Sequence, residues 1–289
     1  MRVVLTTGDS LHGQRVLQRI YERGILLDAV LMLTGSFGPP PAKGNETRAR
    51  RLLRWPRAAA SAARRKVRFH RSRRASYASR CARVIATGDM NSRRLRRDLR
   101  RLAPDFLVLG GGGILLPETI ETAAMGVLNV HPALLPWVRG CGVVGHSLEQ
   151  GVALGATVHR VDRGIDTGAV VARRLLAVPP GPASLAALEL AADELAAEMM
   201  ADVVEGIVRR GELPRGVPQA ERHPLYRWPP AAERPRHEAL AASGRAHELF
   251  ERWRPLCTDT ARWTLPAEPF AAPISLTGVE SSGSSENYR

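Results

Sequence analysis

Cysteine is scarce in this sequence of 289 residues. The three cysteines, Cys81, Cys141 and Cys257, are widely spaced and form no C-x-x-C pair. Three cysteines are too few to cross-link a chain of this size, which excludes a fold built on disulfides and favours a reducing compartment. We therefore expect a cytoplasmic protein with one large hydrophobic core, with or without an appendage.

Long apolar runs are also missing. The first residues, Met-Arg-Val-Val-Leu-Thr-Thr-Gly-Asp-Ser, turn polar before an apolar segment of signal-peptide length can form. No later run approaches the roughly 20 apolar residues that a membrane-spanning helix needs. Secretion is not indicated, and no membrane partner is expected.

Acidic residues are nearly absent from one segment. Residues 48–101 contain 20 of the 42 basic residues and only two acids, Asp89 and Asp98, so the formal charge of +14 comes from this segment. The only lysines are Lys43 and Lys66, and an arginine bias in an alanine-rich chain can reflect a GC-rich genome. Arginine runs are more often solvated faces than binding sites, so nucleic acid is a secondary expectation, to be reached through this segment.

The pattern of apolar residues predicts a parallel sheet. Residues 2–7 read as a buried strand, a helix follows with Val16 and Ile20 on its apolar face, and residues 27–33 form a second apolar run. Further strands are predicted at 82–86, 105–109 and 127–130, and Asn91 or Ser92 can cap a helix that reaches Leu102. We predict an α/β, Rossmann-like fold whose open, mostly parallel sheet carries helices on both faces.

The expected domain organisation has three parts. Residues 1–178 form the main domain, with a basic excursion at about 40–80. Residues 179–212 form a covering helix, capped by Ser184 and ended by Gly211. Residues 213–289 are rich in Pro, Arg and Ala, and we expect a mostly irregular or helical extension with a short helix near 237–253 and a disordered end.

Three motifs stand close together in the second third of the chain. They are Gly-Gly-Gly-Ile-Leu-Leu-Pro at 111–117, Asn-Val-His-Pro-Ala-Leu-Leu-Pro at 129–136, and Gly-Ala-Thr-Val-His-Arg-Val-Asp-Arg-Gly-Ile-Asp-Thr-Gly at 155–168. Each motif alone is weak, whereas their order and spacing together are specific. Here the sequence resembles the folate-dependent formyltransferase family over residues 1 to about 178, most strongly from 87 to 178.

The resemblance implies a set of site residues. The family's catalytic Asn, His and Asp match Asn129, His131 and Asp166. Its folate pocket, built largely from backbone, matches two segments, and the candidate residues are Ile114, Leu115, Leu116, Asp162, Gly164, Ile165 and Asp166. The co-substrate implied is 10-formyltetrahydrofolate, and no metal is expected to take part.

These residue types suit formyl transfer. A neutral amine attacks the formyl carbon, and the carbonyl oxygen gains negative charge in the transition state. Asn129 and a protonated His131 can donate hydrogen bonds to that oxygen. Asp166 can hold the imidazole in its donating form and relay the proton of the amine through water. Because two bound substrates react directly, no nucleophilic side chain is required.

Acceptor-binding candidates come from two places. Gly8, Asp9 and Ser10 form a turn after the first strand that resembles a phosphate-binding turn, although an ordinary turn between strand and helix explains it as well. His159 either orients Asp166 or is a packed histidine.

Departures from the family narrow the acceptor. The Gly8 turn lacks the Gly-Asn-Gly-Ser-Asn type loop, and no succession of strands is predicted after residue 178. We therefore expect a small-molecule primary amine, such as an amino sugar nucleotide or a specialised metabolite. The alternatives are a methionyl-tRNA formyltransferase-like activity, hydrolysis of formyltetrahydrofolate, and a non-catalytic protein that binds RNA or another polyanion through residues 48–101. The sequence gives no indication of an oligomeric state.

Overall fold

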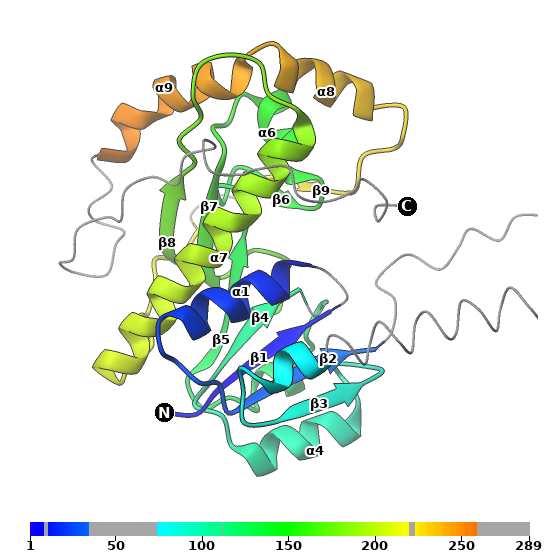
Figure 1. The fold of residues 1–289 in the computed structure, drawn as a ribbon, viewed down its shortest axis with the longest axis vertical. Coiled ribbons are helices and arrows are strands. Elements are labelled where there is room, and N and C mark those ends of the chain that lie inside the picture. Colours follow the sequence, from blue (N-terminus) through cyan, green and yellow to red (C-terminus); the bar gives the residue numbers. More distant parts are fainter. Residues whose placement is uncertain (9–10, 35–73, 112, 220–222, 259–289) are drawn as a thin grey trace, which may run out of the picture. The chain divides into compact units, whose positions relative to one another are not determined.

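The structure, a computed structural model, describes residues 1–8, 11–34, 74–111, 113–219 and 223–258 (Figure 1). Most of the predicted basic excursion, and the predicted disordered end of the chain, lie outside these residues. The chain forms two compact units. The first contains Met1–Asn129 and Val204–Glu212, and the second contains Val130–Val203 and the described residues from Leu213 onward.

The first unit is built on parallel strands. They are β1 (Val3–Thr7), β2 (Ala29–Leu33), β3 (Val84–Thr87), β4 (Phe106–Gly110) and β5 (Gly126–His131). The hydrogen-bonded order is β3-β2-β1-β4-β5, and every pair is parallel. Leu5 of β1 stands between Val30 of β2 and Val108 of β4, and all three are fully buried. Such continuous apolar runs are typical of central strands covered on both faces.

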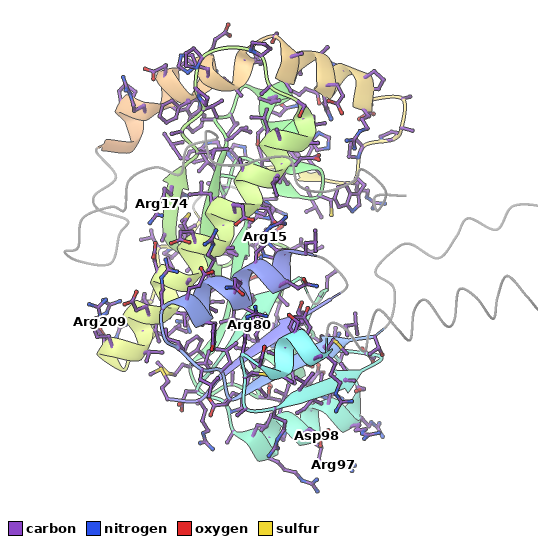
Figure 2. The ribbon with its side chains drawn as sticks, in the orientation of Figure 1. Arg15, Arg80, Arg97, Asp98, Arg174 and Arg209 are labelled. Carbon is purple, nitrogen blue, oxygen red and sulfur yellow. The ribbon has the colours of Figure 1, made fainter. Side chains whose placement is uncertain are left out.

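Two helices of this unit follow from simple sequence patterns. Helix α1 (Leu11–Glu22) buries Val16, Leu17 and Ile20. Helix α4 (Arg93–Leu102) begins at Ser92, whose hydroxyl accepts a hydrogen bond from the Leu95 amide at 3.2 Å. It buries Leu95 and Leu99, while five of its six arginines are exposed. Figure 2 shows Arg97 and Asp98 projecting outward from this helix.

The second unit begins within β5. Strands β7 (Gly155–Arg160) and β8 (Val170–Leu175) pair antiparallel, and the complete sheet has the order β3-β2-β1-β4-β5-β7-β8. The α/β, Rossmann-like, mostly parallel fold predicted from the sequence is confirmed. The predicted covering helix is α7 (Leu185–Arg210). Arg174 of β8, labelled in Figure 2, pairs with Asp202 of α7 at 3.0 Å.

The remaining elements of the second unit come from separate parts of the chain. Helix α6 (Val143–Gln150) follows the two-residue strand β6 (Arg139–Gly140), which pairs in parallel with β9 (Leu225–Tyr226). Helices α8 (Arg234–Ala242) and α9 (Arg245–Thr258) replace the single helix predicted near 237–253, and Gly244, with a φ of +82°, lies between them. Within the described residues, no helix is both long and apolar enough to cross a membrane.

Candidate active site

Strand β5 delivers two polar side chains at its carboxyl end. Val127, Leu128 and Val130 are buried, Asn129 is half-buried, and His131 is 5% exposed. Residues two apart on a strand share one face, so Asn129 and His131 project to the same side. In an open parallel sheet, the carboxyl ends of the strands are where ligands usually bind.

The imidazole of His131 is held from both nitrogens. Nε2 lies 3.0 Å from the carbonyl oxygen of Val138. A carbonyl can only accept, so Nε2 carries a hydrogen and donates it. Nδ1 lies 3.7 Å from Oδ2 of Asp166, which is an ion-pair distance but too long for a hydrogen bond. A second proton on the ring would therefore sit at Nδ1, facing a carboxylate.

Asp166 is held by hydrogen bonds to both its carboxylate and its backbone. Its φ of +54° lies in the left-handed region, which is uncommon for residues other than glycine and is a form of strain found at functional sites. Oδ2 accepts the Gly140 amide hydrogen at 3.0 Å. The side-chain amide of Gln219 donates to the carbonyl oxygens of Asp166 and Gly168, at 3.1 and 2.7 Å. Sequence reasoning missed Gln219, because it lies 53 residues away in the C-terminal extension.

His159 faces the other oxygen of the same carboxylate. It is 2% exposed, its Nδ1 donates to the Arg160 carbonyl at 2.9 Å, and its Nε2 lies 3.7 Å from Asp166 Oδ1. Burial lowers the pKa of His159 to about 4, against the opposing attraction of Asp166. His159 is therefore neutral at physiological pH, with the lone pair of Nε2 directed toward Asp166.

The thiol of Cys141 lies close enough to Asp166 for the charge of this carboxylate to affect its pKa. Its pKa is raised, first by burial and then by the negative charge of Asp166. Its backbone amide donates to the Tyr226 carbonyl at 3.0 Å. A thiol with a raised pKa is a poor nucleophile, which agrees with chemistry that uses no covalent intermediate.

Two of the three apolar residues in the predicted folate segment face outward. Ile114 is 66% exposed and Leu116 46% exposed, whereas Leu115 is buried. Asn91 clamps this loop, because its side-chain amide donates to the Ile114 carbonyl at 2.9 Å and its Oδ1 accepts the Leu116 amide hydrogen at 2.8 Å. Thr119 donates to the same Oδ1 at 3.1 Å. Exposed apolar side chains on a fixed loop can pack against a planar ring such as that of a folate.

The second predicted folate segment is a loop organised by Asp162. Its Oδ1 accepts hydrogen bonds from the Gly164 amide at 2.9 Å and from the Thr167 hydroxyl at 2.6 Å. A Cβ on Gly164 would lie 2.1 Å from the Thr167 hydroxyl oxygen, so only glycine is accommodated. Ile165 is 39% exposed. These contacts therefore fix the conformation of the loop that leads to Asp166.

The structure brings His131, His159 and Asp166 together within the second unit. Asn129 lies two residues before His131 on β5, in the first unit together with the segment 114–116. Gly8 is buried at the end of β1. Asp9 and Ser10 lie outside the described residues, so the prediction of a phosphate-binding turn stays a prediction.

A carboxylate held between two histidines near the end of a parallel strand is the kind of site that α/β enzymes use for proton and group transfer. The chain belongs to the formyl transferase family, whose model matches residues 1–204. The family uses formyltetrahydrofolate.

Several sequence relatives are methionyl-tRNA formyltransferases. The enzyme from Bordetella pertussis is 36% identical over 130 residues, which are 43% of this chain and 40% of that protein. The enzyme from Paraburkholderia phymatum is 31% identical over 174 residues, 60% of this chain and 48% of that protein. The chain thus matches less than half the length of these two relatives.

Solved structures share the fold. A 4-N formyltransferase from Francisella tularensis has a TM-score of 0.53 at 14% identity, covering 84% of this chain and 87% of that one. An N-formyltransferase from Helicobacter canadensis, in complex with folinic acid and dTDP-3-aminofucose, has a TM-score of 0.51 at 14% identity, covering 78% and 71%. At these identities the likeness concerns the fold alone.

Proposed function

We propose that this chain transfers the formyl group of 10-formyltetrahydrofolate to a primary amine of a small molecule. The observation that carries the proposal is the placement of Asp166 between His131 and His159, 3.7 Å from each imidazole. Two of these residues, His131 and Asp166, are among the three that the family resemblance assigns to catalysis; the third is Asn129.

The reaction needs a donor for the developing oxyanion. The amine nitrogen bonds to the formyl carbon, and the bond between that carbon and the folate N10 breaks. Nε2 of His131 is already engaged by Val138, so the nitrogen left to donate to an oxyanion is Nδ1, which faces Asp166 at 3.7 Å without a hydrogen bond; we propose that the reacting imidazole carries a proton there. Asn129, on the same face of β5, supplies a second donor from its amide.

The proton lost by the amine needs an acceptor and must reach the folate N10. Asp166 is oriented by Gly140 and flanked by a neutral His159, so a water between Asp166 Oδ1 and His159 Nε2 could donate to both and pass the proton. His159 is thus proposed as a positioning residue for that water. Two segments are proposed as folate-binding because the family resemblance assigns them to the cofactor: one contains the exposed side chains of Ile114 and Leu116, and the other is the loop at 162–166.

The small-molecule acceptor rests on the C-terminal extension. Its described residues form α8, α9 and the two-residue strand β9 rather than a succession of strands. The Helicobacter canadensis neighbour is in complex with an amino sugar nucleotide, which makes that class the first to test. A second candidate, formylation of aminoacyl-tRNA, is favoured by the sequence identity to methionyl-tRNA formyltransferases.

The test combines two amine acceptors and an amine-free reaction with one set of variants. Purified protein is incubated with 10-formyltetrahydrofolate and amino sugar nucleotides, methionyl-tRNA or no amine, and the formylated product and formate are quantified by mass spectrometry. Asn129→Ala, His131→Asn and Asp166→Asn should each lower kcat, Asn129→Ala by about 10²–10³-fold as expected for loss of one oxyanion donor. Asp98→Asn, on the outward side of α4 (Figure 2), is the matched control and should keep full activity.

The outcomes separate the candidates. Formylated amino sugar supports the proposal, formylated methionyl-tRNA supports the second candidate, and formate without an amine indicates a hydrolase. If polyanion binding dominates instead, affinity for tRNA should fall steeply with salt, whereas formyl transfer should be absent. Wild-type protein that neither binds 5-formyltetrahydrofolate nor consumes the formyl donor would overturn the folate assignment.

A further inference from the structure

A second cluster of ionisable side chains lies outside the candidate active site. His146 and Glu149 stand three residues apart on α6, and His237 comes from α8. One ligand atom of each, His146 Nδ1, His237 Nε2 and a Glu149 carboxylate oxygen, lies within 4.8 Å of the other two. All three residues belong to the second unit.

Both imidazoles are buried with a nitrogen left over. His146 is 6% exposed and His237 1% exposed, yet His146 Nδ1 and His237 Nε2 make no hydrogen bond. A buried polar atom without a partner costs about 1–3 kcal/mol, so two at one point call for an explanation. Both nitrogens are directed at Oε2 of Glu149, at 3.6 and 3.5 Å.

These distances are too long for hydrogen bonds but match a shared metal ion. With metal–ligand distances of about 2.0–2.1 Å, two ligands of a tetrahedral zinc ion lie roughly 3.3 Å apart. Two imidazoles and one carboxylate, with a fourth position for water, form a donor set that zinc and related divalent transition metals accept.

The surrounding contacts leave a lone pair on His146 and a carboxylate oxygen on Glu149 available to a metal ion. His146 Nε2 lies 3.1 Å from the Arg227 carbonyl, so Nε2 carries the hydrogen and Nδ1 keeps the lone pair that a metal needs. Arg236 binds the other oxygen of Glu149 at 3.0 Å, which leaves Oε2 for the cluster. A Cβ on Gly145 would lie 2.3 Å from His237 Nδ1, so glycine allows this ring to approach α6.

We propose that His146, Glu149 and His237 form a binding site for one divalent transition metal ion, with zinc as the expected occupant. The ion would join α6 to α8. The proposal does not depend on formyl transfer, and the histidine spacing along the sequence gave no sign of it, because the third ligand lies 88 residues beyond Glu149.

The site also borders the segment that fixes Asp166. The ring of Tyr226 stacks on His146 with centroids 4.5 Å apart, and Tyr226 pairs with Gly140 across β6 and β9. Gly140 in turn donates to Asp166. A metal ion that immobilises His146 and His237 would therefore stiffen the support of the candidate catalytic carboxylate.

The test is metal binding by the full chain after treatment with a chelator. Zinc chloride is titrated calorimetrically in the presence of a reductant, and cobalt(II) is titrated in parallel and followed by visible absorption. We expect one equivalent of zinc to bind and to raise Tm, and cobalt to give the strong bands of a four-coordinate ion without a thiolate charge-transfer band.

Variants locate the ligands. His237→Ala and Glu149→Gln should weaken zinc binding at least about 10–100-fold, the loss typical even for outer-shell partners. Glu149→Gln keeps its size at a partly exposed position, so it serves if His237→Ala does not fold. His247→Asn is the matched control, because His247 lies on α9, bonded to the Val178 carbonyl, and is not a member of the cluster.

Three results would overturn the proposal. One is the lack of saturable zinc binding by the wild type. Another is a control variant that weakens binding as much as Glu149→Gln does. The third is a cobalt–thiolate band, which would assign the ion to cysteine.

Discussion

Burial of His159 makes the stability of the folded protein depend on pH. Its pKa is lowered to about 4 in the folded protein by burial, whereas an exposed histidine has a pKa near 6.5. Between these two values the unfolded chain binds a proton that the folded protein does not, so stability is full above about pH 6.5 and falls as the pH approaches 4. The loss is on the order of 3 kcal/mol.

Urea denaturation between pH 4 and 7 measures this effect. Replacing His159 by Asn should remove most of the slope in this window, while His247→Asn should keep it. An unchanged pH dependence in His159→Asn would show that other groups control acid stability.

Some residues of the candidate site could be predicted from the sequence and others could not. His131 and Asp166 could be selected because each sits in a local motif, and the structure places them together. The contact between His159 and Asp166 was one of two interpretations that the motif at 155–168 allowed. Gln219 could not be foreseen, because its contact with Asp166 forms only when the chain returns after 53 residues, and local patterns carry no such signal.

Among the elements, the loop before α5 (Pro117–Ile120) depends on Asn91. Asn91→Ala removes two hydrogen bonds to the loop backbone and one to Thr119. We expect weaker binding of 5-formyltetrahydrofolate, because the loop loses the bonds that fix its backbone, together with a loss of about 1 kcal/mol in stability, since the Ile114 and Leu116 partners are exposed to water.

Ser92, the residue after Asn91, provides the control. Ser92→Ala removes the N-cap of α4 and should cost about 1 kcal/mol of stability without changing folate affinity. Calorimetric titration of both variants compares the two. Equal folate affinity in Asn91→Ala and wild type would remove this loop from the proposed folate site.

Strand β6 is equally sensitive to a single methyl group. Gly140 has a φ of +96°, and a Cβ there would lie 2.1 Å from the Tyr226 carbonyl oxygen. Gly140→Ala should separate β6 from β9, misplace the amide that binds Asp166, and lower kcat at least tenfold, since catalytic groups tolerate little displacement.

Gly211→Ala separates backbone strain from this effect. Gly211 has a φ of +79° but open space around its Cβ position, so alanine should cost only about 1–2 kcal/mol of stability. Steady-state kinetics and thermal unfolding of both variants give the comparison. If Gly140→Ala keeps the wild-type kcat, the Gly140 amide does not position Asp166.

At the scale of elements, hydrophobic periodicity located most of the sheet. The runs at 2–7, 105–109 and 127–130 became β1, β4 and β5 because buried parallel strands are apolar throughout. Helix α6 was not predicted, since its sequence Val-Val-Gly-His-Ser-Leu-Glu-Gln is buried over six of eight residues and has no polar face to reveal its period. The cluster of His146, Glu149 and His237 was hidden with it.

At the scale of the whole molecule, the C-terminal extension is part of the fold. Arg160 donates to the Pro214 carbonyl, Val170 and Val217 exchange backbone hydrogen bonds, and Gln219 bridges Asp166 and Gly168. Ala241 and Leu249 are buried. We expect a chain that ends after Glu212 to show a lower Tm and no formyl transfer.

A graded variant makes this prediction sharper. Gln219→Ala leaves the extension in place and should cost about 1–3 kcal/mol while lowering kcat, because two carbonyls near the site lose their donor. Thermal unfolding and formyl-transfer kinetics of the shortened chain, Gln219→Ala and wild type form the series. A shortened chain with wild-type kcat would mean that the extension serves neither folding nor the site.

The bond from Gln219 to the Asp166 backbone has an evolutionary consequence. A gene that acquires a new acceptor specificity by exchanging its 3′ portion for another sequence would also lose Gln219, whose amide binds the backbone of Asp166, the proposed proton-transfer residue. Such recombinants would begin with an impaired reaction centre. Specificity in this lineage should therefore change through point substitutions and short insertions rather than by domain exchange.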